Sequence, residues 1–177
     1  MKKLLSFILV VLVMLVPVTV EGKKKVDKNE YINQWANYEV TTTDVGQNGT
    51  KCLKVWGFGK KVDKAVEQAK KNAVHACLFR GCPGSATARA TPAIFANQGK
   101  GQAASDNIDY FYDFFETNGD YIQFVNITTD GVPSGQDRRE VKGGYKVAIH
   151  VQVMYDNLRE KMKNDGILHT GSAGFTY

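Results

Sequence analysis

The stretch KKNAVHACLFRGCPG, residues 70–84, places a histidine and two cysteines close together in the sequence. These residue types bind metals and carry thiol chemistry. The surrounding apolar pattern predicts a helix over 62–79, where residues two positions apart point about 200° away from each other. His75 then falls on the face of the lysines and Cys77 on the apolar face, so they cannot act as joint ligands or as a nucleophile and its base. We predict a solvated histidine and a core cysteine.

The chain has three cysteines, Cys52, Cys77 and Cys82. Zinc takes about four ligands, commonly in closely spaced pairs, and no C-x-x-C is present. We therefore predict no metal site and no cofactor. Cys77 and Cys82 flank the predicted helix end and could form a disulfide if the chain turns back at Gly81. A bridge from Cys52 to either partner stays open, because sequence alone does not fix connectivity.

The motif GFGKK, residues 57–61, follows a predicted strand and opens the predicted helix, as a phosphate-binding loop would. The third glycine of G-x-G-x-x-G is absent, because Val62 stands there. The alternative is a tight strand-to-helix turn in which the glycines supply conformational freedom. Lys60 and Lys61 remain candidates for contacting an anion at the helix N-terminus.

The motif DYFYDFFE, residues 109–116, is dominated by aromatic side chains. At helical spacing its phenylalanines share one face, which predicts a core helix with amphipathic tyrosines at its margins. The alternative is a surface that faces a partner, formed by Tyr110, Tyr112 and Phe95 together with a long loop over 82–105. Long loops inside compact domains are uncommon and are often functional.

These segments belong to a larger pattern of elements. Strand-like runs flank turn residues at 45–49, and Gly143-Gly144 separates two further extended runs, so both regions predict hairpins. Helices are predicted over 62–79, 105–119 and 155–167, and a strand over 120–131. The order predicts an α+β fold, with a mostly antiparallel sheet of about five strands and two or three helices on one face.

The N-terminus indicates the destination of the chain. A basic start precedes an apolar run, LLSFILVVLVMLVPV, which is shorter than the ~20 residues that span a bilayer. This pattern is typical of a secretory signal peptide over 1–22. We expect a polar leader over 23–36, one domain over 37–167 and a tail over 168–177. The mature chain is expected to be exported, periplasmic, outer-membrane-associated or extracellular, and not an integral membrane protein.

The formal net charge is +5, and several lysines lie in the predicted leader. Nucleic-acid binding would need a basic stripe interleaved with exposed aromatic residues, in a compartment that holds nucleic acid. The sequence gives neither signal, so no nucleic-acid partner is expected.

The segment LKVWGFGKKVDKAVEQAKKNAVHACLFRG, residues 53–81, resembles small bacterial envelope domains. The similarity is to LPP-type outer-membrane lipoproteins and to the N-terminal domain of the flagellar ring protein FlgT. It lies in a G-x-G turn followed by alanines at every fourth position, and GGYKVAIHVQVMYDNLREKM (143–162) resembles the second half of such domains. The resemblance implies a domain for assembly or binding. The absence of a lipid-attachment cysteine and the long loop depart from that pattern.

We therefore expect a non-enzymatic, exported binding or scaffold domain that contacts other envelope proteins or itself. The alternative is a ligand-binding module for an anionic small molecule or glycan at Lys60 and Lys61. An enzyme is the third possibility, although no paired carboxylates, Ser-His-Asp set or H-E-x-x-H motif is visible.

Overall fold

A computed structural model describes residues 37–47 and 49–169. The predicted signal peptide, the leader and most of the predicted tail lie outside these residues. The described chain forms an antiparallel sheet with helices packed against it, which confirms the α+β prediction.

The sheet has five strands in the order β1-β2-β5-β3, and β4 also pairs with β5. Strand β5 is the long central strand. Its C-terminal half pairs with β3 and its N-terminal half with β4. Both predicted hairpins are present, β1–β2 and β4–β5. The strands are β1 (Val40–Val45), β2 (Thr50–Gly59), β3 (Val125–Ile127), β4 (Arg138–Val141) and β5 (Gly144–Met154).

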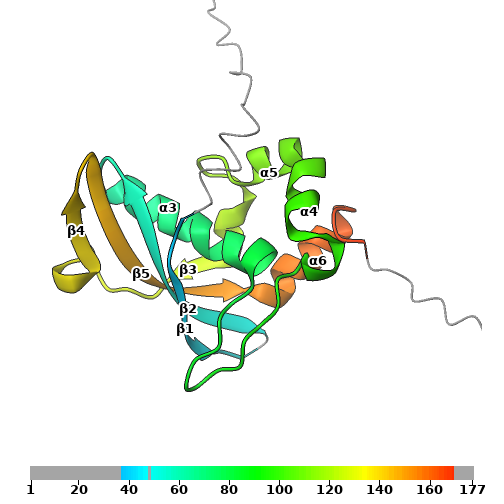
Figure 1. The fold of residues 1–177 in the computed structure, drawn as a ribbon, viewed down its shortest axis with the longest axis horizontal. Helices are drawn as coiled ribbons and strands as arrows, with labels where there is room; N and C mark the ends of the chain where they lie inside the picture. Colours follow the sequence, from blue (N-terminus) through cyan, green and yellow to red (C-terminus); the bar gives the residue numbers. More distant parts are fainter. Residues whose placement is uncertain (1–36, 48, 170–177) are drawn as a thin grey trace, which may run out of the picture.

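Helix α3 (Val62–His75) lies along one face of the sheet, and the other helices gather at one end of it (Figure 1). They are α4 (Lys100–Asp106), α5 (Ile108–Phe114) and α6 (Tyr155–Asn164). The predicted helix over 62–79 is present, but its last turn is a π-helix, η1 (Ala76–Arg80). The predicted helix over 105–119 is shorter than expected. The predicted strand over 120–131 is replaced by a 3-10 helix, η3 (Asp120–Phe124), followed by the short β3.

Alternation along β2 and β5 determines which side chains form the core. Leu53, Val55, Val147 and Ile149 are 0 to 1 % exposed, and they face α3 because side chains alternate between the two faces of a strand. The alanines of α3 are buried against them, as their small size predicted. Burial of this apolar face is the main driving force for the fold.

Gly57 and Gly59 allow α3 to approach β2 closely. A Cβ at Gly57 would collide with the backbone of Ala65 and Ala69, and one at Gly59 with Lys64 and Ala65. Neither glycine has a positive φ. The expectation that these glycines supply turn freedom is therefore wrong, because they supply space between the helix and the strand.

The segment 82–99 is part of the core, although it contains little regular structure. Cys82 and Thr91 form an isolated antiparallel bridge, and the backbone N–H groups of Ile94 and Phe95 donate to carbonyls of η1. Thr42 Oγ1 on β1 donates to the carbonyl of Pro83. A short 3-10 helix, η2 (Ala96–Gln98), and α4 then lead into α5. The predicted loop over 82–105 is thus tied to β1 and to the end of α3.

Candidate functional site

The sheet face opposite α3 carries Trp56 close to two cationic side chains. The Arg139 guanidinium lies 5.1 Å from the indole centroid, and the Lys146 ammonium lies at the same distance. Strand register explains the arrangement, because Arg139 pairs with Lys146 across β4 and β5, and Lys146 pairs with Phe58 across β5 and β2. Phe58 is 52 % exposed. Cation–π contacts of this kind stabilise the ring and present positive charge beside it.

Carboxylates lie at two edges of this surface. Glu39 accepts a hydrogen bond from Lys146 Nζ at 2.7 Å, and that bond lowers the pKa of Glu39. Asp137 pairs with Lys54 at 2.6 Å from the loop that leads into β4. Arg139, Lys146 and Lys54 outnumber these two carboxylates, so the surface remains electropositive. We call Trp56, Phe58, Arg139 and Lys146 the tryptophan platform.

A groove of about 460 Å³ lies beside the tryptophan platform. It runs between the edge of β2 and helix α3. Pairing of β1 with β2 ends at Val40 and Val55, and the last bond is from the Trp56 N–H to the carbonyl of Glu39. Within residues 37–47 and 49–169, no strand pairs with this edge of β2 beyond that point. The lining residues are Asn37, Tyr38, Trp56, Gly57, Phe58, Gln68, Asn72 and Lys146.

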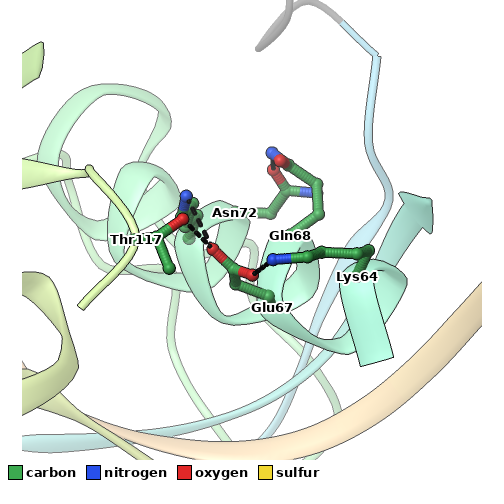
Figure 2. A network of polar contacts seen from close by, with 6 residues as sticks. Lys64, Glu67, Gln68, Asn72 and Thr117 are labelled. Atoms are coloured by element: carbon green, nitrogen blue, oxygen red, sulfur yellow. Dashed lines mark hydrogen bonds and ion pairs between the residues drawn. The ribbon is translucent and has the colours of Figure 1, made fainter. Parts of the chain in front are cut away.

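Two amide side chains of α3 form the helical wall of the groove. Asn72 is only 3 % exposed, and its Nδ2 donates to the Trp56 carbonyl at 2.8 Å. Gln68 Nε2 donates to Asn72 Oδ1 at 3.0 Å. Asn72 thus satisfies a backbone carbonyl that β1 does not reach, as a buried polar group requires. Figure 2 shows Gln68 and Asn72 together, on the other side of α3 from Thr117.

The opposite side of α3 carries an ion network centred on Glu67 (Figure 2). Its carboxylate pairs with Lys64 at 2.8 Å and with Lys71 at 3.1 Å, and it accepts a hydrogen bond from Thr117 Oγ1 at 3.0 Å. Burial would raise the pKa of Glu67, but these three donors outweigh it and lower the pKa to about 2. The network keeps the Glu67 carboxylate deprotonated among its donors. Because one donor is Thr117, the network attaches the residues before η3 to α3.

The prediction of a solvated His75 is wrong, because the residue is only partly exposed and its ring packs among aromatic side chains. Its Nδ1 lies 2.8 Å from the Tyr38 hydroxyl, and its ring contacts Phe79 and Phe115. Burial, aided by the nearby Arg80 charge, lowers the pKa of His75 to about 3. The ring is therefore neutral at physiological pH. Residues 37–39 and α5 both pack over this side of the helix, which the helical pattern alone could not reveal.

The structure brings Cys77 and Cys82 together. Both are thiols, and their sulfurs lie 3.6 Å apart, within hydrogen-bond reach. The predicted disulfide between them stays a prediction. Cys52 lies on the opposite sheet face, because it alternates with Leu53 along β2. That placement disfavours a bridge from Cys52 to either of the other cysteines.

The predicted partner surface at Phe95, Tyr110 and Tyr112 is wrong for Phe95. This ring is fully buried and stacks on Phe79, with centroids 5.4 Å apart. Tyr110 is half-buried. Its hydroxyl donates to Asp165 just after α6, and its ring stacks on Phe114. Tyr112 is partly buried on the same helix. The three residues do not form one surface, and Phe111 and Phe114 lie in the core as the alternative predicted.

Lys60 and Lys61 are exposed at the turn between β2 and α3. Lys61 is the N-cap residue of α3, and its carbonyl accepts the first helical bond, from Ala65 N–H. The backbone at Lys60 lies against Gly144 at the start of β5. The two lysines therefore lie at the same end of the sheet as Phe58 and its cross-strand partner Lys146.

The sequence interpretation missed the tryptophan platform. The available signal was the alternation of Lys54, Trp56 and Phe58 with the apolar Leu53 and Val55, which places the first three on one strand face. Arg139 could not be added to them, because its position beside Lys146 depends on the pairing of β4 with β5.

Searches of family models, curated proteins and solved structures found no match to this chain. Across the described residues, no three or more His, Cys, Asp or Glu side chains gather in a way that could bind a metal ion. No described helix combines the length and apolar character needed to span a bilayer.

Proposed function

We propose that this chain is a non-enzymatic binding domain of a bacterial cell-envelope assembly, and that it binds an extended acidic segment of a partner protein along the open edge of β2. The N-terminal sequence supports export, through its basic start and short apolar run. The observation that carries the binding role is the groove between β2 and α3, which joins a strand edge to the tryptophan platform.

The strand edge favours a polypeptide as the bound molecule. Beyond Trp56, the edge of β2 offers backbone groups that an added strand could pair with, which is how many domains capture extended peptides. Asn72 occupies the Trp56 carbonyl and the Gly57 backbone faces β5, so pairing would begin at Phe58, whose N–H and C=O point to the open edge. The exposed Phe58 ring would cover alternate apolar side chains of that strand.

The charges favour an acidic segment. Arg139 and Lys146 both lie close to the indole, and Lys60 and Lys61 lie at the same end of the sheet. Positive charge of this kind speeds encounter with an acidic partner and discriminates against basic ones. Lys146 Nζ already donates to the Glu39 carboxylate at 2.7 Å, so this position is able to hold a carboxylate.

Binding of an acidic peptide to the purified exported chain tests this proposal. A peptide that alternates glutamate with valine is expected to shift the amide resonances of Gly57, Phe58 and Gly59. The double variant Arg139→Ala/Lys146→Ala should weaken binding by about tenfold or more, and added salt should weaken it further. Lys163→Ala removes an exposed cation from α6 and serves as the matched control.

An anionic oligosaccharide of the same charge separates this proposal from the alternative. If the oligosaccharide binds, the peptide does not, and Lys60→Ala/Lys61→Ala abolishes the signal, then the peptide proposal is overturned in favour of an anionic-glycan module. Peptide binding that is unchanged in the Arg139→Ala/Lys146→Ala variant would also overturn it.

A further inference from the structure

The buried pair Cys77 and Cys82 is held in place by the backbone around it. Cys77 belongs to η1, and its carbonyl accepts the Ile94 N–H at 2.9 Å. Cys82 exchanges two backbone hydrogen bonds with Thr91, at 2.8 and 2.9 Å. Both side chains are at most 2 % exposed, and their sulfurs lie 3.6 Å apart. A disulfide bond is about 2.05 Å long, so a small rotation of the side chains would be needed to form one.

Cys82 reaches a surface depression that Cys77 does not line. Cys82 lines an open groove of about 620 Å³ between the end of η1 and the segment 90–92. Cys77 is fully buried and is not among the residues that line this groove. The lining residues are Val40, Arg80, Gly81, Cys82, Pro83, Ala90, Thr91 and Pro92.

Access to the groove makes the two thiols unequal, and the hydrogen bond between the sulfurs acts in the same direction. This bond lowers the pKa of Cys82, against burial and with help from the Lys51 charge. The same bond, together with burial, raises the pKa of Cys77. Either sulfur can donate in the neutral pair, and a Cys82 thiolate would accept the bond from Cys77, so we expect the cysteine at the groove to ionise first. The thiolate is the reactive form in thiol–disulfide exchange.

We propose that Cys77 and Cys82 form a redox-active dithiol in which Cys82 is the attacking thiol and Cys77 the resolving thiol, with a small disulfide such as glutathione disulfide as the co-reactant. This inference is independent of the binding role proposed above. It also goes beyond a structural bridge, because it assigns different roles to the two sulfurs and makes the bond reversible.

The exchange balances in two steps. The Cys82 thiolate attacks one sulfur of glutathione disulfide, which forms a mixed disulfide and releases one glutathione thiolate. Cys77 then loses its proton to that thiolate and attacks the Cys82 sulfur, which releases the second glutathione. The proton of Cys82 passes through solvent to this second thiolate. In sum, two protein thiols and one glutathione disulfide become one protein disulfide and two glutathione thiols.

Mass spectrometry of the full chain tests the assignment. After oxidation by glutathione disulfide, the wild type is expected to lose the mass of two hydrogen atoms, to link Cys77 to Cys82, and to recover both thiols in excess glutathione. Cys52→Ser should behave in the same way. Cys77→Ala should accumulate a stable glutathione adduct at Cys82, whereas Cys82→Ala should react at Cys77 at least about tenfold more slowly.

A wild-type measurement keeps the test valid if a core variant fails to fold. Brief alkylation of the folded, reduced protein is expected to label Cys82 about tenfold faster than Cys77. Equal labelling, faster labelling of Cys77, or a disulfide that involves Cys52 would overturn the proposal. A Cys77–Cys82 bond that excess glutathione does not reduce in the folded chain would also overturn it, because the bridge would then be structural only.

Discussion

At the scale of single residues, Glu67 illustrates how hydrogen-bond donors around a carboxylate keep it deprotonated. Glu67 is half-buried among two lysines and a threonine hydroxyl, and its pKa is lowered to about 2. Asn72 is uncharged, and its side-chain amide donates a hydrogen bond to the Trp56 carbonyl. Both residues lie on α3, but on opposite sides of it. One attaches the helix to the residues before η3, and the other attaches it to the edge of β2.

The first prediction concerns Glu67 and pH. The pKa of Glu67 is about 2 in the folded chain and 4.5 for an unperturbed glutamate. Its contribution to the free energy of unfolding is therefore complete above pH 4.5 and is lost as the pH falls toward 2. Glu67→Gln should lower the free energy of unfolding by about 1 kcal/mol at pH 7, because the pairs are partly exposed. Urea unfolding between pH 7 and pH 3 measures this.

The control is Glu160→Gln, which changes an exposed carboxylate on α6. It should leave the free energy of unfolding within about 0.5 kcal/mol of the wild type at each pH. The difference between wild type and Glu67→Gln should shrink as pH falls from 5 to 3. A difference that stays constant over this range would show that the charge of Glu67 does not stabilise the fold.

At the scale of elements, the close approach of α3 to β2 depends on small residues on both sides. The alanines of the helix could be recognised in the sequence, because Ala65, Ala69 and Ala73 recur at helical spacing. The motif of their partner glycines predicts turn residues, because a G-x-G motif before a helix is consistent with a turn as well as with a crossing. The distinction depends on where β2 ends, and pairing with β5 extends it through Gly59.

Dependence on contacts between distant segments also explains other differences between the sequence prediction and the structure. Alternation predicted both hairpins, since it depends on local pattern and turn residues. The burial of Phe95 and His75 depends on contacts with distant segments, which no local pattern encodes. Residues 120–124 favour strand by composition, yet Tyr121 and Phe124 are buried in a 3-10 turn against the helices.

The second prediction tests the helix–strand crossing. Gly57→Ala should lower the free energy of unfolding by about 1–3 kcal/mol, because the added methyl group collides with the backbone of α3 and forces the helix away from the sheet. Chemical denaturation measures the change. Phe58→Ala, at the next position on the exposed face, should change stability by much less. Equal effects would mean that α3 does not depend on the small residue at position 57.

At the scale of the whole molecule, the segment 82–99 and the sheet share one core. Phe95 stacks on Phe79 of η1 and contacts the ring of Phe111 on α5, so it connects the segment to the end of α3 and to the aromatic helix. Tyr155 at the start of α6 donates its hydroxyl to the carbonyl of Pro92. These contacts fix the segment in the core, so it is a poor candidate for a partner-binding loop. The tryptophan platform is the better candidate for the binding surface.

The last prediction follows from this shared core. If the segment were an external assembly loop, deleting residues 86–103 would leave a folded domain and change only its association. The buried positions of Ala93, Ile94 and Phe95 instead predict that the deletion abolishes cooperative unfolding. Phe95→Ala should cost about 3–5 kcal/mol, whereas Arg89→Ala, at an exposed position, should cost little. Thermal unfolding and light scattering on the same samples separate loss of fold from loss of association. A deletion variant that unfolds cooperatively near the wild-type temperature would show that the segment is an appendage to the core.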